Sequence, residues 1–71
     1  MGLKMKIVKY LVYNKTDGIM AWPEPFESTE KAEEFIKSFR ERFKFQGYYF
    51  TKRMERIDPK DVELEIEEIL V

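Results

Sequence analysis

The stretch IVKYLVY, residues 7–13, contains six apolar or aromatic residues and one lysine. This β-branched and aromatic composition predicts a strand. A strand sends successive side chains to opposite faces of its sheet, so residues 7–13 offer apolar groups to both faces at once. The rest of the chain must therefore supply a cover for each face or leave one face open.

The chain has 71 residues, enough for one small domain, 1–71, in which residues 1–5 are a candidate disordered segment. It contains no cysteine and no histidine. These absences exclude disulfides, thiolate nucleophiles, the commonest general base and the commonest zinc ligand. The three glycines stand apart from one another, so no phosphate-binding loop is present. The sequence predicts neither an enzyme nor a cofactor, metal or small-molecule substrate.

No segment has the roughly 18–20 apolar residues that a membrane span needs, and the first residues do not have the pattern of a signal peptide. A cytoplasmic protein without a membrane partner is therefore expected.

Residues 29–45 predict an amphipathic helix, because their apolar residues recur at helical spacing. Ser28 or Thr29 can cap its start, and Gly47 can adopt the left-handed conformation that ends it. The apolar stripe consists of Ala32, Phe35, Ile36, Phe39 and Phe43.

Two strands are predicted before the helix, at residues 6–13 and 19–22. NKTDG, residues 14–18, provides a hairpin connection, since its Asp-Gly pair tolerates positive φ. Pro23 and Pro25 stop the second strand because proline cannot donate a hydrogen bond to a neighbouring strand. The second strand is therefore expected to be short and to lie at an edge.

Two further strands are predicted after the helix, Tyr48–Met54 and Val62–Glu67. Residues 58–61 are expected to form a turn or a single helical turn. A competing interpretation makes 62–70 a helix with an apolar stripe, but Leu64 would then point away from it, whereas residues 62–67 alternate as in a strand. The strand is preferred.

These elements predict an α+β fold, ββαββ, with a four-stranded antiparallel-rich sheet and one amphipathic helix packed on one face. If Lys9 points outward, Val8, Tyr10 and Val12 lie under the helix. The same alternation turns Tyr48, Phe50 and Met54 inward. The other face is then uncovered and forms a candidate interaction surface of Lys9, Leu11, Tyr13, Trp22, Tyr49, Thr51 and Arg53.

Three hypotheses account for this surface. In a monomer, long side chains and residues 69–71 would fold over it, as ordinary surfaces carry much apolar area. Alternatively, it could mediate homodimerisation or docking on a partner protein, because uncovered apolar patches rimmed by polar groups usually mark contacts. The leading hypothesis is a small non-catalytic binding or regulatory protein that forms a homodimer.

The third hypothesis is a single-stranded nucleic-acid module. Bases would stack on Tyr13, Tyr49 and Trp22, while phosphates would contact basic residues. The net charge of −1 and the glutamates of the last strand oppose it. Those glutamates, Glu63, Glu65 and Glu67, are expected either to pair with Arg53 across strands or to protect an exposed edge. The candidate phosphate contacts are Lys9, Lys52, Arg53 and Arg56.

Overall fold

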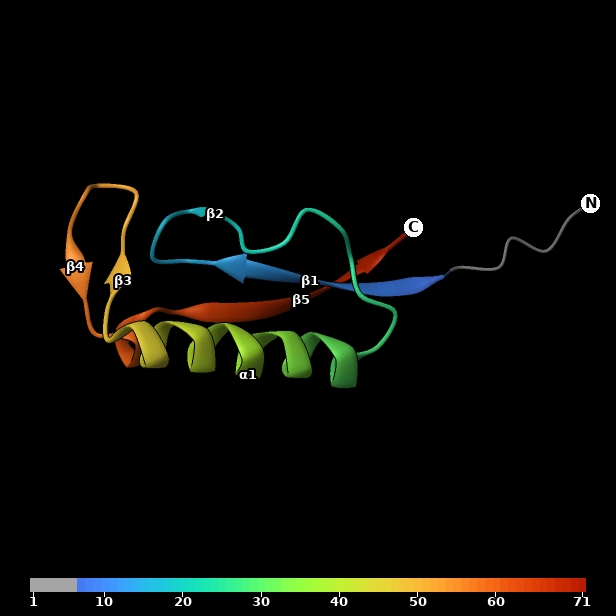
Figure 1. Ribbon diagram of the computed structural model, residues 1–71. Coiled ribbons are helices and arrows are strands. Elements are labelled where there is room, and N and C mark those ends of the chain that lie inside the picture. The colour runs from blue at the N-terminus through green and yellow to red at the C-terminus, as the bar shows by residue number, and fades with distance from the viewer. Residues whose placement is uncertain (1–6) are drawn as a thin grey trace, which may run out of the picture.

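The computed structural model describes residues 7–71, and the α+β class is confirmed (Figure 1). One long helix packs beside a mostly antiparallel arrangement of short and long strands. The elements in chain order are β1 (Val8–Asn14), β2 (Ile19–Met20), α1 (Thr29–Gln46), β3 (Tyr49–Phe50), β4 (Arg56–Ile57), the 3-10 helix η1 (Pro59–Asp61) and β5 (Leu64–Leu70).

The main sheet has the strand order β2-β1-β5, and both of its pairings are antiparallel. β5 pairs with β1 along its whole length, from Leu70 opposite Val8 to Leu64 opposite Asn14. The strand interpretation of the C-terminal segment is therefore confirmed, and the competing helix is not found. The single helical turn before it is also present, with Asp58 as its cap.

The predicted four-stranded sheet and the ββαββ order are not found among residues 7–71. The segment after the helix forms a separate two-stranded hairpin, β3–β4, at the end of the molecule (Figure 1). β5 takes the whole of one edge of β1, and β2, Ala21 and Phe26 bond to the other, so no place beside β1 remains for this hairpin. The predicted strand to Met54 ends at Phe50, because the chain turns at residues 51–54 and Met54 has a φ of 67°.

The helix begins and ends as its residues predict. The Ser28 side chain accepts a hydrogen bond of 3.2 Å from the Lys31 N–H, satisfying one of the amides that a helix start leaves unpaired. Gly47 has a φ of 95°, which costs glycine little, and its N–H bonds back to the last turn. The predicted helix of residues 29–45 is confirmed with one further residue, Gln46.

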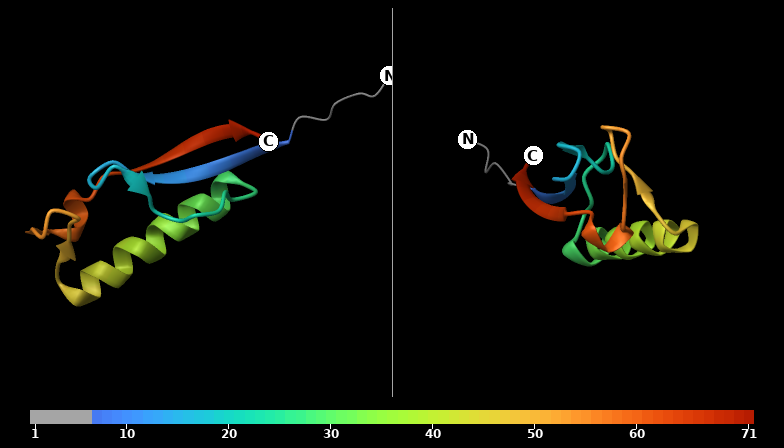
Figure 2. Two further views of the ribbon diagram at one scale, coloured as in Figure 1. Left: turned by 90° about the horizontal axis from the view of Figure 1, so that it is seen from above. Right: turned by 90° about the vertical axis from the view of Figure 1, so that its left-hand side faces the viewer.

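The small core lies between the helix and one face of the sheet. Val12 and Ala32 are fully buried, and Val62 is almost so. Arg40 of α1 donates hydrogen bonds to the carbonyls of Pro59 and Val62, which fastens the helix to the segment that leads into β5. The end-on view shows α1 and the β3–β4 hairpin on the same side of the sheet (Figure 2). The prediction that Val12 lies under the helix agrees with this arrangement.

Candidate interaction surface

One face of the β1–β5 ribbon has no described element packed against it. In both views α1 stays on the opposite side (Figures 1 and 2). Strand pairing places on this open face Lys9 beside Ile69, Leu11 beside Glu67 and Tyr13 beside Glu65. Residues 69–71 continue as an extended strand and do not fold back over the face. Lys9, Leu11 and Tyr13 are nevertheless half-buried, because their neighbours in the sheet shield them.

The structure moves Tyr49 from the predicted open face into the core, so that prediction is wrong. The Tyr49 ring is only 8% exposed, with its centroid 5.7 Å from that of Phe39 and 4.9 Å from that of Phe43. Its hydroxyl donates to the Asp17 carboxylate and accepts a 3.0 Å hydrogen bond from the buried Asn14 side chain. The aromatic stripe of the helix and two polar residues of the first hairpin thus fix the ring inward.

Asp17 joins the two hairpins of the molecule. One carboxylate oxygen accepts from the Tyr49 hydroxyl, and the other accepts a 2.8 Å hydrogen bond from the Lys52 N–H. Its own N–H donates to the Asn14 side chain at 3.1 Å. Among residues 7–71, no buried side-chain nitrogen or oxygen lacks a hydrogen-bond partner. This fully satisfied network is the reason that a two-residue strand holds a defined position.

The environment of Tyr49 raises the pKa of its hydroxyl above the ordinary value. Burial is the largest cause, and the hydrogen bond to Asp17 adds to it, while the hydrogen bond from Asn14 opposes it. The folded protein therefore holds this proton more tightly than the unfolded chain does. The resulting stability is fully present below the ordinary pKa of about 10 and is lost as pH rises through the folded pKa.

This shift predicts a specific alkaline sensitivity. We expect the free energy of unfolding of the wild-type protein to fall above about pH 10. In Tyr49→Phe this fall should be smaller, because phenylalanine has no hydroxyl proton to lose. Urea unfolding of both proteins at pH 8 and pH 11 measures the difference. Tyr49→Phe leaves every other side chain of the protein in place, so an identical pH dependence in both proteins would show that Tyr49 does not contribute.

Thr51 is also wrongly predicted to be on the open face, since it is buried. Its hydroxyl accepts a 3.1 Å hydrogen bond from the Glu55 N–H, and its backbone N–H donates to the Glu55 carbonyl. Both bonds close the turn between β3 and β4. The inward direction predicted for Phe50 and Met54 is reversed as well, because both side chains are exposed. The alternation in this segment is therefore shifted by one residue from the predicted one.

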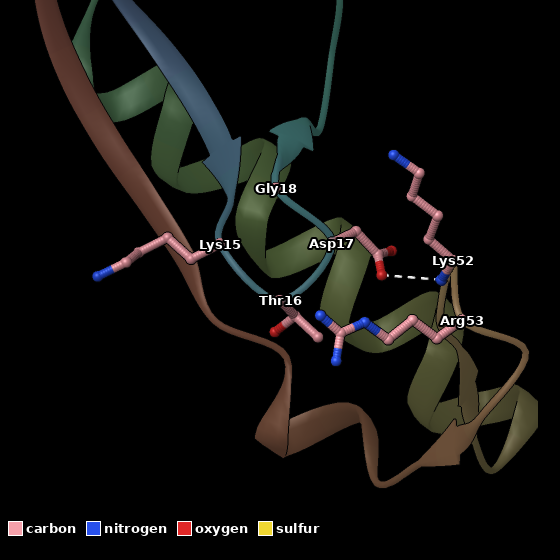
Figure 3. Close-up of a pocket in the computed structure, with 6 residues that line it drawn as sticks. All are labelled: Lys15, Thr16, Asp17, Gly18, Lys52 and Arg53. Carbon is pink, nitrogen blue, oxygen red and sulfur yellow. Dashed lines mark hydrogen bonds between the residues drawn. The ribbon is translucent and has the colours of Figure 1, made fainter.

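Arg53 is exposed at the tip of this turn and faces the turn of the first hairpin. Together they border a cleft of about 210 Å³ (Figure 3). The Arg53 side chain extends toward Thr16, whereas the side chains of Lys15 and Lys52 point away in different directions (Figure 3). These three basic groups therefore do not converge on one position. The cleft lies beyond the end of the open face, so Arg53 does not join Lys9, Leu11 and Tyr13.

Trp22 lies on the helix side of the sheet, which corrects its placement on the open face. Its ring centroid is 5.7 Å from that of Phe35 in α1, and the same phenylalanine packs on Phe26. Phe26 in turn exchanges two backbone hydrogen bonds with Tyr10. The segment that contains Pro23 and Pro25 connects β2 to the start of α1, and Trp22 lies at the beginning of this connection. Of the seven predicted surface residues, only Lys9, Leu11 and Tyr13 share the open face.

The most exposed apolar side chains of the β1–β5 ribbon lie at its end, which extends past the start of the helix (Figure 2). Ile7 is 53% exposed, Val8 36%, Leu70 62% and Val71 60%. We call these four residues the ribbon end. The sequence predicted apolar residues on both faces of residues 7–13. It did not indicate that the strands extend past the helix and expose an apolar end.

The free edge of β5 is a further feature of the β1–β5 ribbon, and the sequence indicated an exposed edge there only as one of two roles for the glutamates. Among residues 7–71, β5 is the last strand in the sheet order, and only its β1 side is paired. Glu65, Glu67 and Glu68 stand opposite Tyr13, Leu11 and Tyr10, and no described residue forms an ion pair with them. The predicted pairing of Glu63, Glu65 and Glu67 with Arg53 is wrong, because β5 pairs with β1 and β3 belongs to the other sheet. The position of Glu65, Glu67 and Glu68 agrees with the alternative, protection of the edge along residues 65–68, whereas residues 69–71 carry no such charge.

No protein-family model, curated protein or solved structure matches this chain.

Within residues 7–71, no helix combines the length and the apolar character that crossing a membrane requires. The same residues contain no group of three or more metal-binding side chains that could hold an ion.

Proposed function

We propose that the protein is a small non-catalytic binding protein that self-associates through its β1–β5 ribbon. The observation that carries the proposal is the ribbon end, where four apolar side chains are each more than a third exposed beside a strand edge that none of the described strands pairs with. Uncovered apolar side chains of this kind are typical of contact surfaces, and unpaired strand edges favour association with another strand.

A non-catalytic role agrees with the chemistry of the chain, which has neither cysteine nor histidine. Tyr49 uses its hydroxyl within the core network, and the raised pKa of that hydroxyl makes it a weaker acid. Its hydrogen bonds to Asn14 and Asp17 give it a structural role.

The nucleic-acid alternative receives less support from the geometry. Base stacking needs several aromatic rings on one open surface. Tyr49 is buried and Trp22 packs on Phe35, so Tyr13 is the only one of the three predicted platforms on the open face. Lys9 is accompanied there by Glu65 and Glu67, which would repel phosphate.

Self-association is tested by changing one residue of the ribbon end. We expect Leu70→Glu to raise the dissociation constant of the dimer at least about 100-fold, since burying a leucine is worth about 1.5–3 kcal/mol and both copies carry the substitution. Sedimentation velocity over a range of protein concentrations measures the change. The matched control is Phe45→Glu, because Phe45 is 96% exposed and lies in the last turn of α1, whereas the ribbon end lies past the start of that helix (Figure 1).

The control should leave the dissociation constant unchanged. A wild-type protein that stays monomeric at millimolar concentration would contradict the proposal. Equal weakening by both substitutions would show that the contact does not depend on the ribbon end.

A further inference from the structure

The backbone hydrogen bonds show which residues of β5 direct their polar groups to the free edge. Val71 donates to the Ile7 carbonyl, and the Glu63 carbonyl accepts from Lys15, so odd-numbered residues of this segment face β1. The N–H and C=O groups of successive strand residues point to alternate sides. The unpaired groups at the edge therefore belong to the even-numbered residues Leu64, Ile66, Glu68 and Leu70.

We infer that a second copy of this chain pairs its β5 with this edge, antiparallel and symmetric about Ile69. The inference rests on the proposed self-association and names its contact. Two identical copies offer identical edges, and a two-fold axis brings the same surface of each together. Each copy then satisfies backbone groups that the other leaves unpaired, which is the property that makes exposed edges associate.

Hydrogen bonding limits the possible registers. Residues that exchange hydrogen bonds across the new pairing must be even-numbered in both copies, because only those point to the edge. Every symmetric register centred on a residue satisfies this requirement, and those centred on Ile66, Glu67, Glu68 or Ile69 also pair at least five of residues 64–71 in each copy.

Charge selects among these registers. Centring on Glu67 or Glu68 places that glutamate directly opposite its own copy, and centring on Ile66 places Glu65 opposite Glu67. Like charges directly opposite destabilise a strand pair. Centring on Ile69 avoids every such contact, since Glu68 then faces Leu70 and Glu67 faces Val71.

The Ile69 register also covers two of the four apolar side chains of the ribbon end, those of Leu70 and Val71. Leu70 and Val71 are 62% and 60% exposed, and each would lie against the second copy. Glu68 and Leu70, whose backbone groups point to the edge, would exchange hydrogen bonds with Leu70 and Glu68 of the second copy. The two sheets would join into one, with both helices on the same side.

Cysteine cross-linking tests the register cleanly, because the chain has no cysteine of its own. At the symmetry axis, residue 69 of one copy forms a non-hydrogen-bonded pair with residue 69 of the other, at a Cα separation of about 4.5 Å. That separation lies within the range of about 4.4–6.8 Å that a disulfide needs. We expect Ile69→Cys to form a covalent dimer under mild oxidation at least about tenfold faster than Phe45→Cys, a measure of random collision.

Glu67→Cys is the matched control on the same strand and face, and in this register it has no cysteine opposite it. Preferential linking of Glu67→Cys would overturn the register. If sedimentation shows a dimer but Ile69→Cys links no faster than Phe45→Cys, the edge pairing is wrong while the proposed function stands. If no dimer sediments at all, both fail.

Discussion

Replacing Tyr49 with serine is expected to unfold most of the protein at room temperature. Truncating a buried aromatic ring costs about 3–5 kcal/mol, and the single core of a domain this short rarely supplies more than about 3–5 kcal/mol of stability. The serine would also leave the buried Asn14 amide and one oxygen of Asp17 without the partner they share. Urea unfolding followed by circular dichroism measures the loss.

Phe50→Ser is the matched control, because Phe50 is the neighbouring residue of the same strand and its ring is exposed. A surface substitution of this kind should cost about 1 kcal/mol or less. If Phe50→Ser were the more damaging of the two, the direction of both side chains would have to be reversed. A well-dispersed NMR spectrum for Tyr49→Ser would equally contradict the buried network.

The contrast between α1 and β3 shows where sequence reasoning succeeds. The helix spans 18 residues, so its apolar stripe repeats several times, and Ser28 and Gly47 mark both ends. A repeated period with a cap at each end leaves little freedom in the assignment. β1 was similarly predictable from composition, and the alternation of residues 62–67 distinguished strand from helix in β5.

β3 offers no comparable repeat, because it contains only Tyr49 and Phe50. In so short a strand, a shift of one residue reverses every side chain. The direction is decided instead by Asn14 and Asp17, which lie more than 30 residues earlier in the chain. No local pattern records such a contact. The inferred open-face positions of Tyr49 and Thr51 failed for this reason.

The interaction surface likewise has one part that a repeated local pattern predicts and one part that it does not. Lys9, Leu11 and Tyr13 follow from the alternation of a seven-residue strand, and the structure places them together. The ribbon end depends on how far β1 and β5 extend beyond the helix, and the free edge depends on strand order. Both are properties of the assembled sheet, and composition and periodicity do not determine them.

The one-sided cover of the sheet leads to a further prediction on two adjacent residues. Val12 is fully buried on the helix side, and Leu11 is on the open face. We expect Val12→Lys to unfold the protein, because an unpaired buried charge costs about 3–5 kcal/mol and the lost apolar contacts add to this. Circular dichroism and the dispersion of the amide NMR spectrum measure the outcome.

Leu11→Lys is the matched control, and it should change stability by about 1 kcal/mol or less. Leu11 stands opposite Glu67 in β5, so the new ammonium group gains a cross-strand partner worth about 0.2–1 kcal/mol in place of the lost apolar contact. Both substitutions introduce the same side chain one residue apart, so only the face differs. If both proteins unfold, each face of β1 is buried, and no open surface remains for a second chain to bind.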